Sequence, residues 1–235
     1  MVKRPGKIVV PSKLTFNHII SYLDVPQGKI QIIPEGVDLN LFHPDENETS
    51  RDMILCTGRF SPNKGHILLI EAFKKFRNRT GWPGELVLAG HYTEKNKHYF
   101  ESLREMSDEK IKILTDINDE ELASLYRQAD FCVYPSVSDE GWGLVVVEAF
   151  ASGKPVICSD LFLETGVASE ERAYIVPRGD ISSLVDAMRA MITSPEMKAR
   201  LAAEGLAYAN GLNWGKMVES IEKAICEVIS ENEKK

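Results

Sequence analysis

The chain has 235 residues, of which 43% are hydrophobic and 27% are charged, and its formal net charge is -7. A chain of this length can form one large α/β domain, or one complete domain with part of another, around a substantial core. The acidic balance and the scattered lysines and arginines argue against nucleic acid as a partner and against a polybasic membrane-binding patch, so an anionic ligand has to be captured by local chemistry.

The first fifty residues predict a single β-α-β unit. A strand is expected within residues 7–12, a helix over 13–23 and a second strand within 29–38, followed by the polar segment 43–52. The opening apolar run is too short for a signal peptide, and no later segment approaches transmembrane length. We therefore expect a cytoplasmic protein, or one that lies peripherally on the inner face of a membrane, with residues 1–45 set apart from the rest.

Residues 46–235 predict a Rossmann-like doubly wound parallel sheet with C-terminal helices. Short β-branched apolar runs alternate with segments of helical period, notably 65–80 and 119–128, which is the pattern of β-α units. The predicted strands lie within residues 53–58, 85–90, 110–115, 130–136, 155–160 and 173–177. After them the pattern is wholly helical over 180–193, 195–210 and 213–235.

The four cysteines are Cys56, Cys132, Cys158 and Cys226, and no two of them form a C-x-x-C pair. The first three lie in apolar runs that resemble strands. This placement predicts buried, reduced thiols rather than disulfides or a zinc site, and we expect no metal in the protein.

In a doubly wound sheet, ligands bind outside the carboxyl ends of the strands, so the loops after the predicted strands are the first candidates for a site. The loop that follows strand 53–58 carries Gly58, which permits a tight turn, and the two cations Arg59 and Lys64. These cations could clamp a diphosphate. The loop is neither a Walker A sequence nor a G-x-G-x-x-G motif. The alternative is a solvated turn with ordinary surface cations.

A second loop, over residues 138–143, leads into an apolar segment that predicts a buried helix beginning near Leu144. Gly141 and Gly143 allow the backbone to approach a ligand closely. The free N–H groups of the first helical turn and the helix dipole form an anion site without any basic side chain, and a phosphate suits such a site.

Two glutamates flank this loop. Glu148 lies about one turn into the apolar helix, where an unpaired carboxylate is costly to bury and needs hydrogen-bond donors. A ribose diol offers two hydroxyls to one carboxylate; the alternatives are a structural salt bridge or a glutamate that faces solvent. Glu140 could accept hydrogen bonds from sugar hydroxyls beyond the phosphates; its alternative is a solvated loop acid.

The stretch from Glu140 to Glu148 resembles the E-x7-E signature of group 1 retaining glycosyltransferases with the GT-B architecture. Residues 58–73, "GRFSPNKGHILLIEAF", are similar to the first loop and helix of that family's C-terminal domain. The segments 32–44, 122–136, 153–160 and 213–221 match the family in order, so the resemblance covers most of the chain. The chain departs from the family where Glu35 replaces an asparagine, Trp142 replaces a phenylalanine, and residues 159–166 replace a Gly-Gly-x-Pro-Glu turn.

The resemblance implies a role for each candidate residue. Glu148 would bind the ribose of a nucleotide-sugar donor, and Arg59 and Lys64 would neutralise its diphosphate. The amides of Gly143, Leu144 and Val145 would bind the same diphosphate, while Glu140 and the amides of Gly141 and Trp142 would hold the transferred sugar. Residues 46–235 would be the C-terminal donor-binding half of a GT-B fold, and residues 1–45 a remnant of the N-terminal acceptor domain plus a linker.

The resulting hypothesis is a retaining hexosyltransferase that transfers a sugar from a nucleotide-diphosphate-sugar to an unknown acceptor, such as a sugar or a lipid-linked glycan. It needs no cofactor beyond the donor, and the chain would be incomplete on its own. The alternative is a non-catalytic nucleotide-sugar-binding fragment or subunit that needs a separate acceptor-domain chain. A glycoside hydrolase is disfavoured, because a glutamate inside a helix beside phosphate-binding amides is poorly placed to flank a scissile bond.

Overall fold

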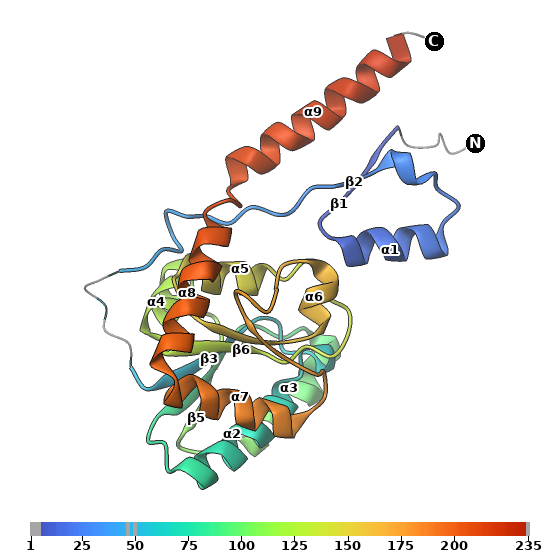
Figure 1. Cartoon of the computed structure of the whole chain (residues 1–235). Helices are drawn as coiled ribbons and strands as arrows, with labels where there is room; N and C mark the ends of the chain where they lie inside the picture. The colour runs from blue at the N-terminus through green and yellow to red at the C-terminus, as the bar shows by residue number, and fades with distance from the viewer. Residues whose placement is uncertain (1–5, 46–47, 49–50, 234–235) are drawn as a thin grey trace.

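The computed structural model describes residues 6–45, 48 and 51–233. Its largest element is a six-stranded parallel sheet with the strand order β5-β4-β3-β6-β7-β8 (Figure 1). The strands are β3 (Met53–Thr57), β4 (Glu85–Ala89), β5 (Ile111–Leu114), β6 (Phe131–Tyr134), β7 (Val156–Ser159) and β8 (Tyr174–Val176). Each lies within a predicted run, so the prediction of a Rossmann-like parallel sheet is confirmed.

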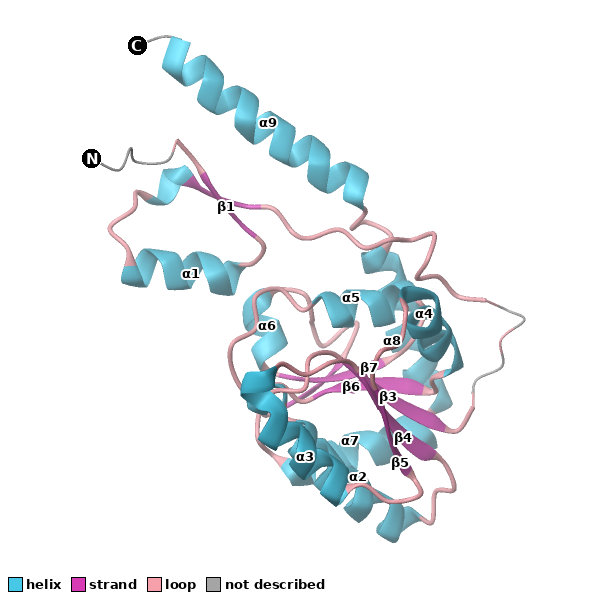
Figure 2. Ribbon diagram, turned by 180° about the vertical axis from the view of Figure 1, so that it is seen from behind, coloured by secondary structure: helices cyan, strands magenta, loops and turns pink. Residues whose placement is uncertain are grey.

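Helices cover both faces of this sheet. One face carries α2 (His66–Thr80), α3 (Lys97–Met106) and α7 (Ile181–Thr193), and the other carries α4 (Asp119–Gln128), α5 (Leu144–Ala151), α6 (Leu161–Thr165) and α8 (Pro195–Ala209) (Figures 1 and 2). The chain moves outward from β3 through β4 to β5 and then crosses to β6 on the other side of β3. The strand order therefore reverses between β3 and β6, which is where such folds bind ligands.

The core lies on both sides of the sheet. Every residue of β3, β6 and β7 is buried, as expected for parallel strands that are covered on both faces. Cys56, Cys132 and Cys158 lie in these three strands as free, buried thiols, which confirms their predicted placement. The acidic start of α4 also forms a helix cap, because Asn118 and Glu121 each accept a hydrogen bond from the other's backbone N–H at 2.9 Å.

The N-terminal unit forms a separate two-stranded parallel sheet, as predicted. It consists of β1 (Ile8–Val10), α1 (Lys13–Tyr22) and β2 (Ile30–Ile32). The polar segment predicted to follow it includes residues 46–47 and 49–50, which lie outside the described residues. The last helix, α9 (Trp214–Glu233), leaves the main body and lies beside β1, where Lys7 forms an ion pair with Glu227 (Figure 1).

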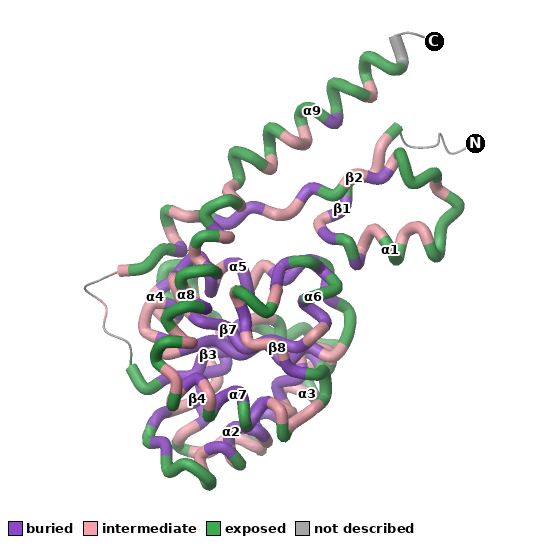
Figure 3. Tube along the Cα trace, in the orientation of Figure 1, coloured by how far each residue is buried: buried purple, intermediate pink, exposed green. Residues whose placement is uncertain are grey.

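Apolar surface remains uncovered on this outlying part. Val9 and Ile32 on the small sheet and Ile225 and Ile229 on α9 are between 42% and 54% exposed, and Figure 3 shows α9 exposed along most of its length. A groove of about 270 Å³ runs between β1 and α9. A two-stranded parallel sheet cannot bury both of its faces by itself, so apolar side chains stay exposed on this part of the fold.

Two helices of the main body were not predicted from the sequence. Helix α3 follows β4, and the short helix α6 stands where the family resemblance gave a turn. Tyr99, Phe100, Leu103 and Met106 recur at helical spacing in α3, and this spacing is the signal that could have found it. Within the described ranges, no helix combines the length and the apolar character that crossing a membrane requires.

Candidate functional site

Three adjoining cavities lie where the strand order reverses. Their volumes are about 650, 210 and 310 Å³. Arg59 lines the first two, and Thr57, Gly58 and Val145 line the last two, so the cavities form one continuous cleft along the carboxyl ends of β3, β4 and β6. The predicted location of the site, outside the carboxyl ends of these strands, therefore coincides with a cleft.

The floor of the cleft is bare backbone. The N–H of Gly58 donates to the carbonyl of Ala89 at 2.9 Å, and Gly58 has a φ of 131°. A Cβ added at Gly90 would lie 1.8 Å from the carbonyl oxygen of Gly58. Only glycine fits there, because the neighbouring atom belongs to the main chain and cannot move aside.

The N-terminus of α5 opens into the 210 Å³ cavity. Gly143 caps the helix with a φ of 108°, and the following amides of Leu144 and Val145 have no hydrogen-bond partner within the described chain. Gly143, Leu144 and Val145 all line this cavity. Unpaired N–H groups and the positive end of the helix dipole favour an anion, so the geometry agrees with the predicted phosphate site.

Lys64 and Glu140 meet in the same cavity although they are 76 residues apart. Lys64 Nζ donates to Glu140 Oε1 at 2.6 Å, and Ser136 Oγ donates to the same oxygen at 2.6 Å. The side chain of Glu140 is only 5% exposed, so it is not a solvated loop acid. Because Lys64 is already paired, an anion in this cavity must share its ammonium group with Glu140 or displace it.

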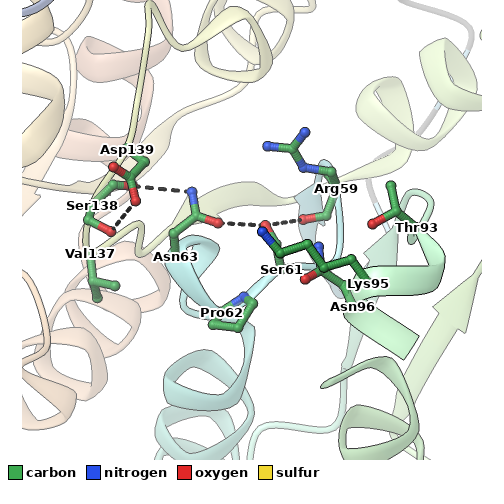
Figure 4. A pocket seen from close by; sticks show the side chains of 10 residues that line it. All are labelled: Arg59, Ser61, Pro62, Asn63, Thr93, Lys95, Asn96, Val137, Ser138 and Asp139. Atoms are coloured by element: carbon green, nitrogen blue, oxygen red, sulfur yellow. Dashed lines mark hydrogen bonds between the residues drawn. The ribbon is translucent and has the colours of Figure 1, made fainter. Parts of the chain in front are cut away.

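Arg59 has a different environment. It is exposed, lines both the 650 Å³ and the 210 Å³ cavities, and forms no ion pair with any described residue. Figure 4 shows its guanidinium directed away from the turn at residues 61–63. That turn is tied to the opposite loop by Asn63, which accepts from Ser61 Oγ at 2.6 Å and donates to the carbonyl of Ser138 at 3.2 Å (Figure 4).

Glu148 lines the 310 Å³ cavity on the other side of Gly58. Tyr126 donates its hydroxyl to Glu148 Oε2 at 2.9 Å, and no cation pairs with this carboxylate among the described residues. Burial raises the pKa of Glu148 to about 7; the Tyr126 hydrogen bond lowers it in part, and the charge of Asp119 raises it. The structure thus replaces the alternative of a structural salt bridge with a carboxylate that is held by one phenol.

Gly141 and Trp142 lie at the rim and line none of the three cavities. The carbonyl of Gly141 accepts the hydroxyl of Thr15 from α1 at 3.3 Å. The side chain of Trp142 is core, 5% exposed, and its indole N–H has no partner. Their predicted contact with a sugar can therefore involve only backbone amides.

Sequence reasoning missed several polar residues of the cleft. Tyr126 and Ser136 were not singled out, and neither was His66, which lines the 210 Å³ cavity with both ring nitrogens unpaired. Burial, assisted by the charge of Lys64, lowers the pKa of His66 to about 3, so its ring is neutral. Asp116 has a φ of 57°, which is unusual for a residue other than glycine and marks a constrained turn beside Glu148.

The raised pKa of Glu148 predicts a pH dependence of stability. Between about pH 4.5 and 7 the folded chain retains a proton that the unfolded chain has lost, so the free energy of unfolding falls as pH rises, by up to roughly 3 kcal/mol. Glu148→Gln should remove this component. Denaturant unfolding at pH 5 to 8 measures it, with Glu222→Gln on exposed α9 as control. Parallel curves for wild type and Glu148→Gln would contradict it.

Comparisons with known proteins agree with this fold. The chain is 25% identical to the D-inositol 3-phosphate glycosyltransferase of Nocardia farcinica, over 94% of the chain and 52% of the relative. Sucrose-phosphate synthase from Thermosynechococcus elongatus has a similar structure, with a TM-score of 0.83 and 26% identity, over 98% of this chain and 60% of that one. Anabaena HepE, solved with UDP and glucose, gives a TM-score of 0.84 at 18% identity, covering 94% and 63%.

This chain spans about half the length of the curated relatives it matches. Its residues 40–207 match the family model of the glycosyl transferases group 1. The matched range contains the whole six-stranded sheet, both cleft loops and the helices α2 to α7. The chain therefore belongs to the group 1 glycosyltransferase family, and its sheet is the Rossmann-like fold of GT-B proteins.

Proposed function

We propose that the cleft binds a nucleotide-diphosphate-sugar and that this chain carries the donor site of a retaining hexosyltransferase. The observation that carries the proposal is the 210 Å³ cavity, which two unpaired helix amides, Arg59 and Lys64 surround. These groups offer an anion several donors at the positive end of a helix. The cavity opens on both sides into larger spaces, as a diphosphate between a nucleoside and a sugar requires.

The positions of the two glutamates suggest how the donor is oriented in the cleft. Glu148 faces the 310 Å³ cavity, where its carboxylate can accept both hydroxyls of a ribose. Glu140 lies at the other end of the diphosphate cavity and can accept hydroxyls of the transferred sugar. Buried carboxylates require donors, and a nucleotide sugar supplies hydroxyls at both positions.

In the proposed reaction the bond between the anomeric carbon and the phosphate oxygen breaks, and a bond to the acceptor oxygen forms on the same face of the sugar. The proton of the acceptor hydroxyl passes to the departing phosphate oxygen. Negative charge grows on the diphosphate during this step, and Arg59, Lys64 and the α5 amides stabilise it where it develops. Residues of the chain thus supply the charge stabilisation without a metal ion.

The acceptor side is proposed to come from further polypeptide. Residues 1–45 would be the end of an acceptor domain, and the exposed apolar faces of β1, β2 and α9 would be the surface that the rest of that domain covers. The alternative, a binding subunit without transfer activity, differs in one respect. If the protein is a transferase, a polypeptide that covers this surface would restore sugar transfer. If it is only a binding subunit, such a polypeptide would leave donor binding without transfer.

The proposed function is tested by nucleotide binding. UDP, GDP or ADP at 100 times its Kd should stabilise the chain by about 2.7 kcal/mol, and the base that shifts the melting temperature most identifies the donor class. Glu148→Ala should weaken the binding of that nucleotide by roughly 1.5 to 3 kcal/mol, because the ribose hydroxyls lose a charged acceptor.

Calorimetry with wild type, Glu148→Ala and the surface control Glu222→Ala provides the comparison. Equal affinity in all three would remove Glu148 from the site. No thermal shift with any nucleoside diphosphate would refute the proposed donor site as a whole.

A further inference from the structure

Glu148 is held in place by a buried cluster of three hydroxyls. Tyr126 donates to Glu148 Oε2 at 2.9 Å. Thr57 Oγ1 lies 2.6 Å from the Tyr126 hydroxyl and 3.2 Å from that of Tyr134, and the two phenols are 3.3 Å apart. All three hydroxyl-bearing residues are at most 5% exposed, so water does not replace these bonds.

When Glu148 is ionised, the hydroxyls of the cluster can direct their protons toward the carboxylate. A carboxylate only accepts, so the Tyr126 proton points to Glu148, and the Tyr126 oxygen is free to accept from Thr57. The Tyr134 hydroxyl also donates to the Tyr126 oxygen, at 3.3 Å. Each bond thereby directs a proton toward the carboxylate, and charge-assisted bonds of this kind are the strong ones.

A protonated Glu148 breaks this order. The neutral carboxyl group gains a donor and is a weaker acceptor, so the carbonyl of Val145, at 3.2 Å from the Tyr126 hydroxyl, competes better for the Tyr126 proton. Val145 is also one of the residues whose amide faces the diphosphate cavity. Tyr126 is therefore in contact with both the carboxylate and the first turn of α5.

Titratable groups from helix α4 and from two loops surround the carboxylate of Glu148. Its titratable neighbours are Tyr126 and Asp119 on α4 and His91 and Asp116 in the loops that share its cavity, while Tyr134 on β6 contacts Tyr126. Burial and the charge of Asp119 raise the pKa of Glu148, and the hydrogen bond from Tyr126 opposes them. Burial and the charge of Glu148 raise the pKa of Tyr126 well above its usual value, so this phenol remains a donor.

We propose that Tyr126 is a positioning residue for the donor, which orients the Glu148 carboxylate toward the ribose hydroxyls and keeps it an acceptor. This inference rests on the proposed function, since it assigns Glu148 to a ribose. The Tyr126 hydroxyl does not touch the ligand; it acts through Glu148. Thr57 supports it from β3, which links the ribose end of the cleft to the loop that carries Arg59.

The test uses Tyr126→Phe in the full chain. The variant retains the ring, which packs edge-on against Phe42 at 5.6 Å, and removes only the hydroxyl. We expect about tenfold weaker binding of the preferred nucleoside diphosphate and an unchanged affinity for its 2′,3′-dideoxy analogue, which has no hydroxyls for Glu148. The pH at which the binding affinity is half of its maximum should also rise, because the Glu148 carboxylate loses its hydrogen-bond donor and its pKa increases.

Two further variants make the result specific. Thr57→Val should give a smaller loss in the same direction, and Thr57→Ser should restore binding. Tyr208→Phe is the matched control, since it removes a half-buried tyrosyl hydroxyl on α8 whose acceptor is the carbonyl of Gly166 at 3.5 Å.

The outcomes separate this inference from the proposed function. If Glu148→Ala weakens the nucleotide but Tyr126→Phe binds ribose and dideoxy forms as wild type does, the positioning role is refuted and the donor site stands. If Tyr126→Phe weakens both forms equally with an unchanged pH midpoint, its role is structural. If wild type does not distinguish the two forms, the assignment of Glu148 to ribose fails.

Discussion

Incubated with its nucleotide sugar and a panel of sugar, lipid and protein acceptors, the isolated chain is expected to bind the donor and to transfer negligibly. Correct positioning of the acceptor hydroxyl beside the anomeric carbon contributes up to roughly 7 to 11 kcal/mol to such a reaction. Among the described residues, the proposed donor cleft lies at the six-stranded sheet, and the N-terminal unit contributes the two strands β1 and β2. Slow hydrolysis of the donor is the most that this arrangement should support.

The measurement combines nucleotide release with mass analysis of the products. The donor is the sugar conjugate of the nucleotide that gives the largest thermal shift, and the Arg59→Ala variant supplies the background. Robust turnover by the chain alone would mean that residues 1–45 suffice as an acceptor platform, and the proposed domain division would be wrong.

The second large effect concerns the two cations. Arg59→Ala should weaken binding of the nucleoside diphosphate by roughly 1.5 to 3 kcal/mol, or about 10-fold to 150-fold, and leave nucleoside binding nearly unchanged. Arg59 is exposed and has no ion-pair partner among the described residues, so its loss should not alter folding. Chelators should have no effect on binding.

Lys64 requires a paired design, because Lys64→Met also leaves Glu140 buried without its cation. An uncompensated buried charge costs roughly 3 to 5 kcal/mol of stability. The double variant Lys64→Met with Glu140→Gln removes the charge and should recover that stability, but not the diphosphate affinity. Glu140→Gln alone should bind diphosphate at least as well as wild type, since Lys64 is then released from its 2.6 Å ion pair.

Isothermal calorimetry with the nucleoside diphosphate and the nucleoside, together with thermal unfolding, compares the three single variants and the double variant with wild type. Normal diphosphate binding by Arg59→Ala and by the double variant would show that the cations do not clamp the ligand. Loss of binding in EDTA would require a metal-dependent site in place of this clamp.

The strands and most helices of the main body could be predicted because each combines apolar periodicity with clear boundaries. Helix α5 begins at Leu144, as the glycine step before it indicates, and α4 begins with its acids. Helix α3 was missed because polar residues interrupt its apolar ones, so the helical spacing of Tyr99, Phe100, Leu103 and Met106 was not recognised. The position of α9 beside β1 was also not predicted, since a helix's own sequence does not show which partner covers it.

For the site, the sequence indicated which loops meet but not which side chains pair. Glycines, cations and a carboxylate in an apolar helix are conspicuous, so Arg59, Gly143 and Glu148 could be named. Thr57 and Tyr126 resemble core residues at their positions in the pattern, and only the three-dimensional packing reveals that their hydroxyls reach Glu148. The pairing of Lys64 with Glu140 joins residues 76 positions apart, which no local spacing encodes.

The backbone floor at Gly58 and Gly90 has a consequence for attempts to redesign this protein. Since a single methyl group at position 90 would overlap main-chain atoms, and the positive φ of Gly58 disfavours a side chain, a mutant library gains little by varying these two residues. New preferences must be introduced from the walls. Suitable positions for saturation mutagenesis are His91, Ile117 and Leu122, which line the 310 Å³ cavity proposed for the nucleoside and do not belong to the hydroxyl cluster.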